Sequence, residues 1–223
     1  MLTPPNEEDA LAEIYYLTQE TTKNWRKLLK YGETLEVEIK RKLLWLWPTE
    51  KHLWQINKLL RVYNITNVLS IGCGNGLFEW LLQEALNLQV YGLEVDRQWW
   101  LSNYAIKSFI PLNYIEDMRK DDVPGSFLQK CCVSNSWNFA LMFCYFNNRS
   151  AFLEYLKLYQ GNYIIIIGPL ENTDIYTDPL PLEPNFPEDT TVKWILLQTL
   201  PIENNILVLY EKSIQIQNNC DKI

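Results

Sequence analysis

The sequence predicts an α/β fold: a doubly wound, mainly parallel seven-stranded sheet with a C-terminal antiparallel hairpin strand and an N-terminal helical extension. Three observations predict it. From residue 66 onward, short apolar segments alternate with helical ones, as in βαβ units. The apolar segments are hydrophobic at nearly every position, as strands buried on both faces are. Near the end, two further apolar segments flank a short polar turn, as hairpin strands do.

The first part of the chain is expected to be helical. Over residues 8–63 apolar residues recur at spacings of three and four, for example Leu11, Ile14 and Leu17. Pro48, followed by the N-cap candidate Thr49, separates two of these helices. Since no Gly-rich linker follows, we divide the chain into an N-terminal helical extension, residues 1–65, and a Rossmann-like domain, residues 66–223.

The alternating region supplies five strands and three helices. The expected strands are 67–71, 88–94, 110–115, 138–145 and 163–167, and the expected helices are 77–86, 97–106 and 149–159. Residues 169–190 hold five prolines and six acids with no basic residue, which predicts a long loop. Strands 193–200 and 205–212 then form the hairpin. We expect the loop to act as a lid over an acceptor site, with a structural strap as the alternative.

Composition restricts the class of protein. The 223 residues are 48% hydrophobic and 21% charged, which excludes a disordered chain or a coiled coil. The longest aliphatic run, Ile164–Ile167, is too short for a membrane span. The acidic, Pro-containing N-terminus does not resemble a secretory signal. We therefore expect a cytoplasmic protein without membrane contact.

Charge and metal-ligand residues exclude further classes. The net charge is −7, and residues 66–223 carry 10 basic against 18 acidic side chains, so nucleic acid is not expected as a partner. The basic residues between Arg26 and Lys42 are interpreted as a solvated helix face. The five cysteines form no C-x-x-C pair, and His52 is the single histidine. We expect no metal site and no histidine-based triad.

A glycine-rich turn follows the first expected strand. Gly72, Gly74 and Gly76 separate that strand from a helix, and Glu94 ends the next strand, where a carboxylate can accept ribose hydroxyls. A dinucleotide fingerprint requires a third glycine at position 77, where this chain has Leu77. The G-x-G-x-G spacing favours S-adenosylmethionine over NAD. An NAD-dependent oxidoreductase and a turn that binds nothing stay open as alternatives.

With these motifs in place, residues 66–212 resemble the class I S-adenosylmethionine-dependent methyltransferases, in a poorly characterised branch of that superfamily. Val68–Gly76 resembles the family's first motif and Tyr91–Glu94 the second. Tyr114–Met118 resembles the segment after the third strand, and Asn138–Tyr145 the fourth-strand motif. The closing hairpin also matches, because the family ends its sheet with a strand inserted antiparallel.

The resemblance implies S-adenosylmethionine as the cofactor and a role for each matching residue. Gly72 and Gly74 border its amino-acid part, Glu94 holds the ribose, and Val95 packs on the adenine. Asp117 accepts from the adenine amino group and Met118 flanks the ring. The complete set of implied cofactor-binding residues is Gly72, Cys73, Gly74, Gly76, Glu94, Val95, Asp117, Met118 and Cys144.

Two positions depart from the family's pattern. Ser70 stands where many members have an acid, which weakens one contact toward the amino end of the cofactor. The fourth motif, Cys144 to Asn147, lacks the Asp/Asn-Pro-Pro-aromatic pattern of amino-group methyltransferases, which argues against adenine-N6 and glutamine methylation. Cys144 is interpreted as a core residue rather than a reactive thiol.

The resulting hypothesis is a methyltransferase acting on a non-nucleic-acid acceptor, either a small molecule or a protein. Tyr145 and Asn147, just past the fourth strand, are the catalytic candidates that orient the acceptor, with ordinary loop roles as their alternative. The competing hypothesis is a non-catalytic pseudoenzyme, a sensor or scaffold that binds the cofactor. In either case the N-terminal tryptophans Trp45, Trp47 and Trp54 are candidates for a protein-partner surface.

Overall fold

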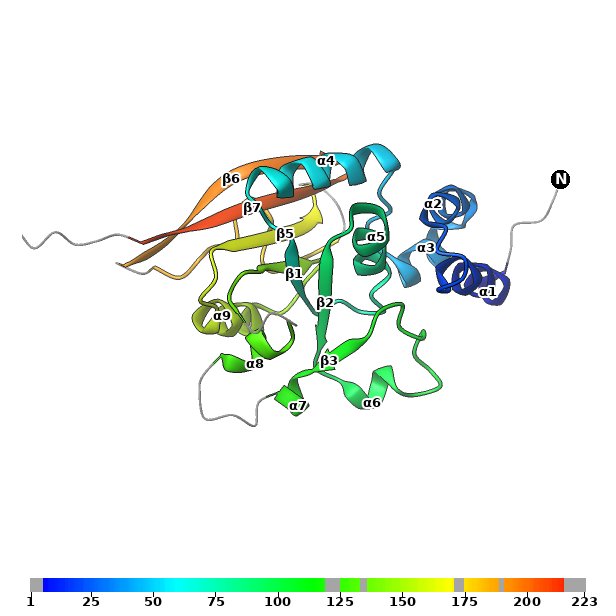
Figure 1. The fold of residues 1–223 in the computed structure, drawn as a ribbon, viewed down its shortest axis with the longest axis horizontal. Helices are drawn as coiled ribbons and strands as arrows, with labels where there is room; N and C mark the ends of the chain where they lie inside the picture. Colours follow the sequence, from blue (N-terminus) through cyan, green and yellow to red (C-terminus); the bar gives the residue numbers. More distant parts are fainter. Residues whose placement is uncertain (1–5, 119–124, 133–135, 171–174, 189–190, 215–223) are drawn as a thin grey trace, which may run out of the picture.

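The computed structural model describes residues 6–118, 125–132, 136–170, 175–188 and 191–214 (Figure 1). Its centre is one seven-stranded sheet of order β3-β2-β1-β4-β5-β7-β6. Strands β1 to β5 run parallel, and β7 is antiparallel to both β5 and β6. The predicted fold class is confirmed. The strands are β1 Asn67–Ile71, β2 Gln89–Glu94, β3 Leu112–Tyr114, β4 Ala140–Cys144, β5 Tyr163–Pro169, β6 Val192–Ile202 and β7 Asn205–Ile214.

Helices cover both faces of the sheet because the strands are apolar on both. Alternate residues point to opposite faces, so Val68 joins one core cluster and Leu69 the other. The first cluster packs under α4, Glu50–Val62, and α5, Leu77–Leu86. The second packs under α8, Ser126–Lys130, and α9, Arg149–Leu158, on the opposite side of the sheet (Figure 1).

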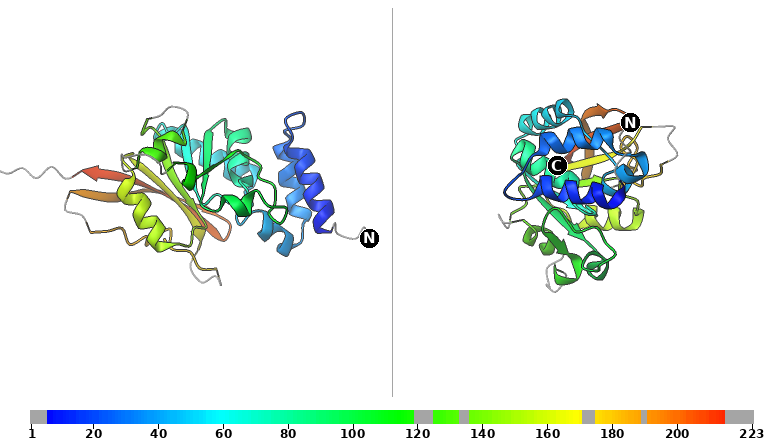
Figure 2. Two further views of the ribbon diagram at one scale, coloured as in Figure 1. Left: turned by 90° about the horizontal axis from the view of Figure 1, so that it is seen from below. Right: turned by 90° about the vertical axis from the view of Figure 1, so that its right-hand side faces the viewer.

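The N-terminal helices lie at one end of the molecule in Figure 1 and in the left view of Figure 2, and the right view of Figure 2 looks onto that end. They are α1 Glu7–Thr18, α2 Trp25–Thr34 and α3 Val37–Leu43, and buried residues of all three join the first core cluster. The predicted start of α4 at Thr49 is confirmed. The Thr49 hydroxyl accepts from the His52 amide, and the His52 ring accepts from the Thr49 amide, so the single histidine closes a capping box.

One predicted helix is wrong over most of its length. The expected helix 97–106 is limited to α6, Arg97–Trp100, and residues 101–107 form turns and irregular chain. The Ser102 hydroxyl accepts from the Tyr104 amide, a local bond that competes with helix formation. Two short helices, α7 Ile115–Met118 and α8, follow β3 and were not predicted.

The described part of the proline-rich segment, residues 175–188, is attached to the fold rather than free. Arg149 of α9 donates to the Pro184 carbonyl at 2.5 Å, and the Tyr210 hydroxyl donates to the Pro181 carbonyl at 2.7 Å. The Phe186 ring lies 4.9 Å from the Tyr210 ring and 5.8 Å from the Trp194 ring, measured between centroids. These contacts favour the strap alternative over the lid for this part of the segment.

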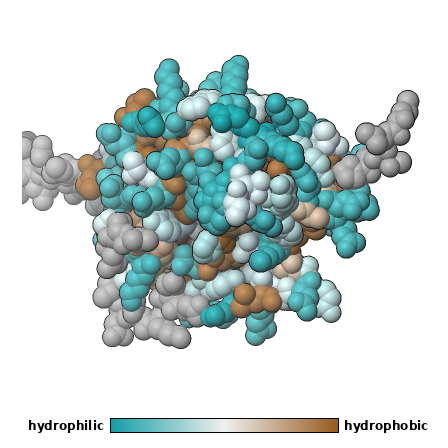
Figure 3. All heavy atoms as spheres, turned by 45° about the vertical axis from the view of Figure 1, so that its right-hand side comes forward, coloured by the Kyte–Doolittle hydropathy of each residue, from teal (hydrophilic) through white to brown (hydrophobic). Residues whose placement is uncertain are grey.

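On the face seen in Figure 3 hydrophilic side chains dominate, and hydrophobic ones are scattered among them. Within the described residues, every helix is too short or too polar to cross a lipid bilayer.

Candidate functional site

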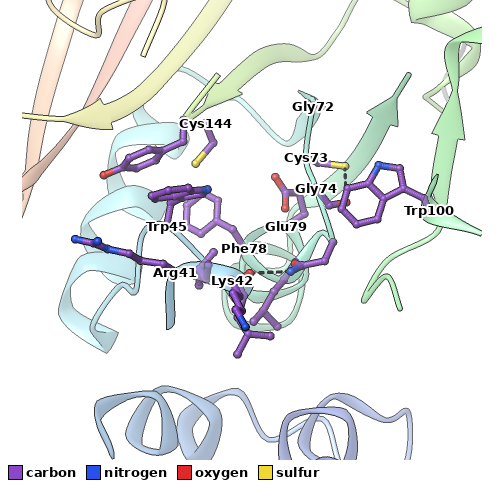
Figure 4. Close-up of a pocket in the computed structure, with 15 residues that line it drawn as sticks. Arg41, Lys42, Trp45, Gly72, Cys73, Gly74, Phe78, Glu79, Trp100 and Cys144 are labelled. Atoms are coloured by element: carbon purple, nitrogen blue, oxygen red, sulfur yellow. Dashed lines mark hydrogen bonds between the residues drawn. The ribbon is translucent and has the colours of Figure 1, made fainter. Parts of the chain in front are cut away.

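A pocket of about 240 Å³ lies where the carboxyl ends of β1 and β4 meet the end of α3 (Figure 4). In doubly wound sheets this edge is where ligands bind. The pocket combines backbone of the glycine turn, aromatic rings, two cations and a buried carboxylate. Its lining residues are Arg41, Lys42, Leu43, Leu44, Trp45, Gly72, Cys73, Gly74, Asn75, Leu77, Phe78, Glu79, Trp100, Cys144 and Tyr145.

The glycine turn forms one wall because its backbone adopts left-handed angles. Gly74 has φ of +64° and Gly76 has φ of +75°, a region that side chains other than glycine rarely adopt. At Gly74 an added Cβ would meet its nearest neighbour, Trp100, only at 3.9 Å, so the missing side chain leaves open space in the pocket. At Gly76 a Cβ would lie 2.5 Å from Ile110, so that glycine serves packing.

Glu94, the predicted ribose-binding acid, lies directly behind the glycine turn. Its Oε1 accepts from the Gly74 amide at 2.6 Å and its Oε2 from the Val95 amide at 3.3 Å. Burial raises the pKa of this carboxyl, while the bonds from Gly74, Val95 and the Trp100 side chain lower it. Glu94 therefore holds the turn in shape and, because each carboxylate oxygen can accept two bonds, retains capacity for a hydroxyl ligand.

A second carboxylate, Glu79 in the first turn of α5, projects into the pocket. The residue is 2% exposed, and its Oε1 accepts from the Ser70 hydroxyl at 2.7 Å. Burial raises its pKa to about 7. In Figure 4 the carboxylate is drawn between Trp45 and Cys144 on one side and Gly74 and Trp100 on the other.

The end of α3 closes the pocket from the N-terminal side. The Trp45 ring stacks on the Tyr145 ring with centroids 5.4 Å apart and planes 14° apart. The Asn75 amide donates to the Leu43 carbonyl at 2.8 Å, which ties this segment to the glycine turn. Arg41 and Lys42 add positive charge at the rim.

Tyr145 occupies a strained position at the carboxyl end of β4. Its φ is +51°, and its amide donates to the Ile167 carbonyl at 2.8 Å. Its hydroxyl donates to Asn205 Oδ1. Burial raises the pKa of the phenol to about 12, so the hydroxyl stays protonated at neutral pH. Residues held in such backbone conformations are concentrated at functional sites.

The two cysteines of the pocket are neutral thiols. Burial raises the pKa values of Cys73 and Cys144 well above the ordinary value, and the nearby Glu79 carboxylate raises both further. Since the thiolate is the reactive form, these thiols are poor nucleophiles. The interpretation of Cys144 as a packing residue agrees with this environment.

The structure brings together only part of the predicted site. Gly72, Cys73, Gly74, Cys144 and Tyr145 line the pocket, and Glu94 stands behind its glycine wall. Gly76 and Val95 do not line it, and the Val95 side chain is 57% exposed.

Three further predicted residues lie elsewhere or are only partly described. Asn147 is exposed and forms a backbone bridge with Asp178 outside the pocket. Asp117 and Met118 belong to α7, and their side chains lie outside the described residues. The roles of all three in binding or catalysis stay predictions.

Several pocket residues were not predicted from the sequence. Trp100, Arg41 and Trp45 reach the pocket through tertiary packing, and no motif marks them. Glu79 could have been found. It lies in a helix whose neighbouring positions Phe78, Trp80 and Leu81 are all apolar, and a helix that is apolar all round is buried, its acid included.

The three N-terminal tryptophans do not share one surface role. Trp45 stacks in the pocket, and Trp47 packs on Gly32 and donates from its indole to the Lys40 carbonyl at 3.3 Å. Trp54 is 51% exposed, and its indole donates to Glu50 at 3.4 Å. A protein-partner surface built from all three stays a prediction.

The sheet, its antiparallel hairpin and the glycine turn at the end of β1 together decide the fold. The chain has the fold of the class I methyltransferases. Sequence comparison adds nothing to this assignment: no protein-family model matches the chain, and no curated protein matches it.

Solved structures similar to this chain share little sequence with it. They include an S-adenosylmethionine-dependent methyltransferase from Aquifex aeolicus, with 15% identity, TM-score 0.42 and coverage of 91% of this chain and 97% of that one. An O-methyltransferase from Bacillus cereus in complex with SAH has 14% identity, TM-score 0.43 and coverage of 92% and 100%. An SAH-bound methyltransferase from Podospora anserina has 13% identity, TM-score 0.43 and coverage of 96% and 99%. At these values the likeness carries no argument about activity.

Proposed function

We propose that the protein is an S-adenosylmethionine-dependent methyltransferase whose acceptor is a small molecule or a protein. The observation that carries the proposal is the pocket itself. The open glycine wall at Gly74, the carboxylate of Glu94 behind it and the Tyr145–Trp45 stack all meet at the carboxyl edge of the sheet.

The pocket residues fit this cofactor in charge and shape. The space left by Gly74 allows close approach to the backbone, and Glu94 can accept hydroxyl groups of a ribose. Glu79 can pair with a positively charged group of the ligand, and the cations of α3 can pair with a negatively charged one. When bound, the cofactor supplies a methyl group on an already activated sulfonium leaving group.

The protein's own contribution is then to position the acceptor and to exclude water. Tyr145 suits this task because its backbone is held at the end of β4 and its hydroxyl is fixed by Asn205. With a pKa of about 12, the phenol acts as a hydrogen-bonding group and not as a base at neutral pH. The Trp45 ring stacked on it shields one side of the acceptor position.

Charge supports an acceptor other than nucleic acid. Of the basic residues in the N-terminal helices, Arg26 pairs with Glu50 at 3.0 Å and Lys27 with Glu13 at 2.9 Å. Lys42, at the rim of the pocket, pairs with Glu7. These pairs neutralise three of the cations that could contact phosphates, and the chain as a whole carries a charge of −7.

The direct test is methyl transfer. The purified protein is incubated with methyl-labelled S-adenosylmethionine and a panel of small amines, alcohols, carboxylic acids, peptides, RNA and DNA. Release of S-adenosylhomocysteine with a labelled small molecule or peptide is expected, and Tyr145→Phe should lower the rate at least about tenfold without changing cofactor affinity. Labelling confined to RNA or DNA contradicts the proposed acceptor class. Cofactor binding without transfer to any member of the panel would favour the pseudoenzyme.

A further inference from the structure

The Glu79 carboxylate is buried in the pocket, and no salt bridge among the described residues balances its charge. The residue is 2% exposed. Ser70 donates to one of its oxygens at 2.7 Å. Burying an unpaired carboxylate costs free energy, so such a group takes up a proton or gains a cationic partner.

Glu79 differs in this respect from the other acid near the turn. Both oxygens of Glu94 accept backbone amides, those of Gly74 and Val95. Glu79 accepts from a single side chain, Ser70, and its carboxylate lines the open space. Among the described residues no group of three or more metal-ligating side chains occurs, so a single carboxylate here suits an ammonium group better than a metal ion.

The same pocket carries the opposite charge at its rim. Arg41 and Lys42 line it from α3, and Lys42 already pairs with Glu7. A pocket with a buried carboxylate and cations at its rim is compatible with a zwitterionic amino-acid group.

We propose that Glu79 binds the ammonium group of the amino-acid part of the cofactor, with Ser70 holding the carboxylate in place. Ser70 therefore does not remove the acidic contact at this end of the site. The acid is supplied from α5, nine residues further along the chain. This inference rests on the proposed function.

The charged and titratable groups around Glu79 agree with this role. Cys73 and Cys144 are neutral thiols at physiological pH, and the Glu94 carboxylate raises the pKa of Glu79 by repulsion. Arg41 and Lys42 lie across the same pocket. Because burial raises the Glu79 pKa to about 7, much of the free protein carries a proton there at pH 6, and an incoming ammonium group should displace it.

The test compares two ligands that differ only in the amino-acid part. S-adenosylhomocysteine and 5′-methylthioadenosine are titrated calorimetrically into wild type, E79Q, S70A and E84Q. Glu84 is the matched control, because it lies on the same helix and pairs with Lys23 at 3.1 Å, away from the pocket. Titrations at pH 6 in buffers of different ionisation enthalpy measure the protons released on binding.

E79Q is expected to weaken S-adenosylhomocysteine about 10- to 100-fold and to change 5′-methylthioadenosine affinity less than about threefold. S70A should weaken S-adenosylhomocysteine by a smaller factor, and E84Q should match wild type. Wild type should release a proton with S-adenosylhomocysteine but not with 5′-methylthioadenosine, a result that needs no variant.

Equal weakening of both ligands by E79Q, unchanged S-adenosylhomocysteine affinity in E79Q, or the absence of proton release would overturn the role of Glu79 and leave the proposed function standing. If neither ligand binds wild type, the proposed function itself fails, and this inference fails with it.

Discussion

At the scale of single residues, Glu79 gives the molecule a pH-dependent stability of its own. Its pKa is about 7 in the folded protein against 4.5 for an ordinary glutamate, because the folded environment is dry. Between these two pH values the folded state binds more protons than the unfolded state. The free energy of unfolding therefore decreases as pH rises from about 4.5 to about 7, and this contribution is constant above that range.

The first prediction follows from that sign. Glu79→Gln keeps a group that can accept from Ser70 but removes the buried charge. The variant should be more stable than wild type at pH 8, by up to about 3 kcal/mol, since one pH unit corresponds to about 1.4 kcal/mol. Near pH 4.5 the two proteins should be equally stable. Urea unfolding at both pH values measures this, with Glu84→Gln as the control, and a difference independent of pH would contradict it.

The second prediction separates two glycines of the same turn. Gly74→Ala and Gly76→Ala each place a side chain at positive φ, at a cost of about 1–2 kcal/mol. At Gly74 the added methyl has room and projects into the pocket, whereas at Gly76 it meets Ile110 at 2.5 Å. Gly74→Ala should therefore lose at least about tenfold in S-adenosylhomocysteine affinity, and Gly76→Ala should lose more stability. Equal affinities for the two folded variants would show that the turn at Gly74 serves the fold alone.

At the scale of elements, the proline-rich segment illustrates why composition did not predict its role. Five prolines and six acids leave little to bury, and this led to the expectation of a lid. In the described part, Phe186 and the carbonyls of Pro181 and Pro184 provide the attachment to α9 and β7. A count of residue types does not reveal that one half-buried ring and two backbone carbonyls attach the segment to the fold. None of residues 175–188 lines the pocket.

The third prediction tests this attachment. Phe186→Ala removes ring contacts with Phe152, Tyr210 and Trp194 and should cost about 2 kcal/mol of stability. Leu182→Ala, at a position 41% exposed in the same segment, should cost less than about 0.5 kcal/mol. Thermal and urea unfolding of both variants provide the measurement. Small and equal losses of stability in the two variants would contradict the strap and favour a lid.

At the scale of the whole molecule, the negative net charge disfavours the binding of polyanions such as RNA and DNA. The net charge is −7, and three cations of the N-terminal helices, Arg26, Lys27 and Lys42, pair with acids of other helices. The fourth prediction is that a fluorescent RNA or DNA oligonucleotide shows no binding in anisotropy titrations at 150 mM salt. Tight binding that weakens steeply with added salt, as phosphate contacts require, would contradict the proposed acceptor class.

The fold was predictable because it depends on patterns local to each segment. Residues 67–71 and 77–86 form β1 and α5 with the predicted bounds, and the hairpin lies where the polar turn indicated. The helix predicted beyond Trp100 failed because Ser102 bonds the local backbone instead. The spacing of apolar residues, on which the predicted helix was based, does not reveal such local hydrogen bonds.

Only those parts of the site that belong to a recognisable sequence motif could be predicted. The glycine turn and Glu94 lie together in the structure as their spacing indicated, because consecutive parallel strands end at the same edge. Arg41 in α3 and Trp45 just after it lie some thirty residues upstream of the glycine turn, and only packing of the first core cluster brings them to the pocket. The division of the chain at residues 65 and 66 stays a prediction, although both parts contribute to that cluster.

The measurement that tests the central claim most directly is a calorimetric titration of the wild-type protein with S-adenosylhomocysteine, with NAD titrated in parallel. Saturable binding of one S-adenosylhomocysteine per chain, with no heat from NAD, is the predicted result, because we propose that Gly74 and Glu94 hold an adenosyl amino acid. Binding of NAD alone, or of neither ligand, would contradict the account.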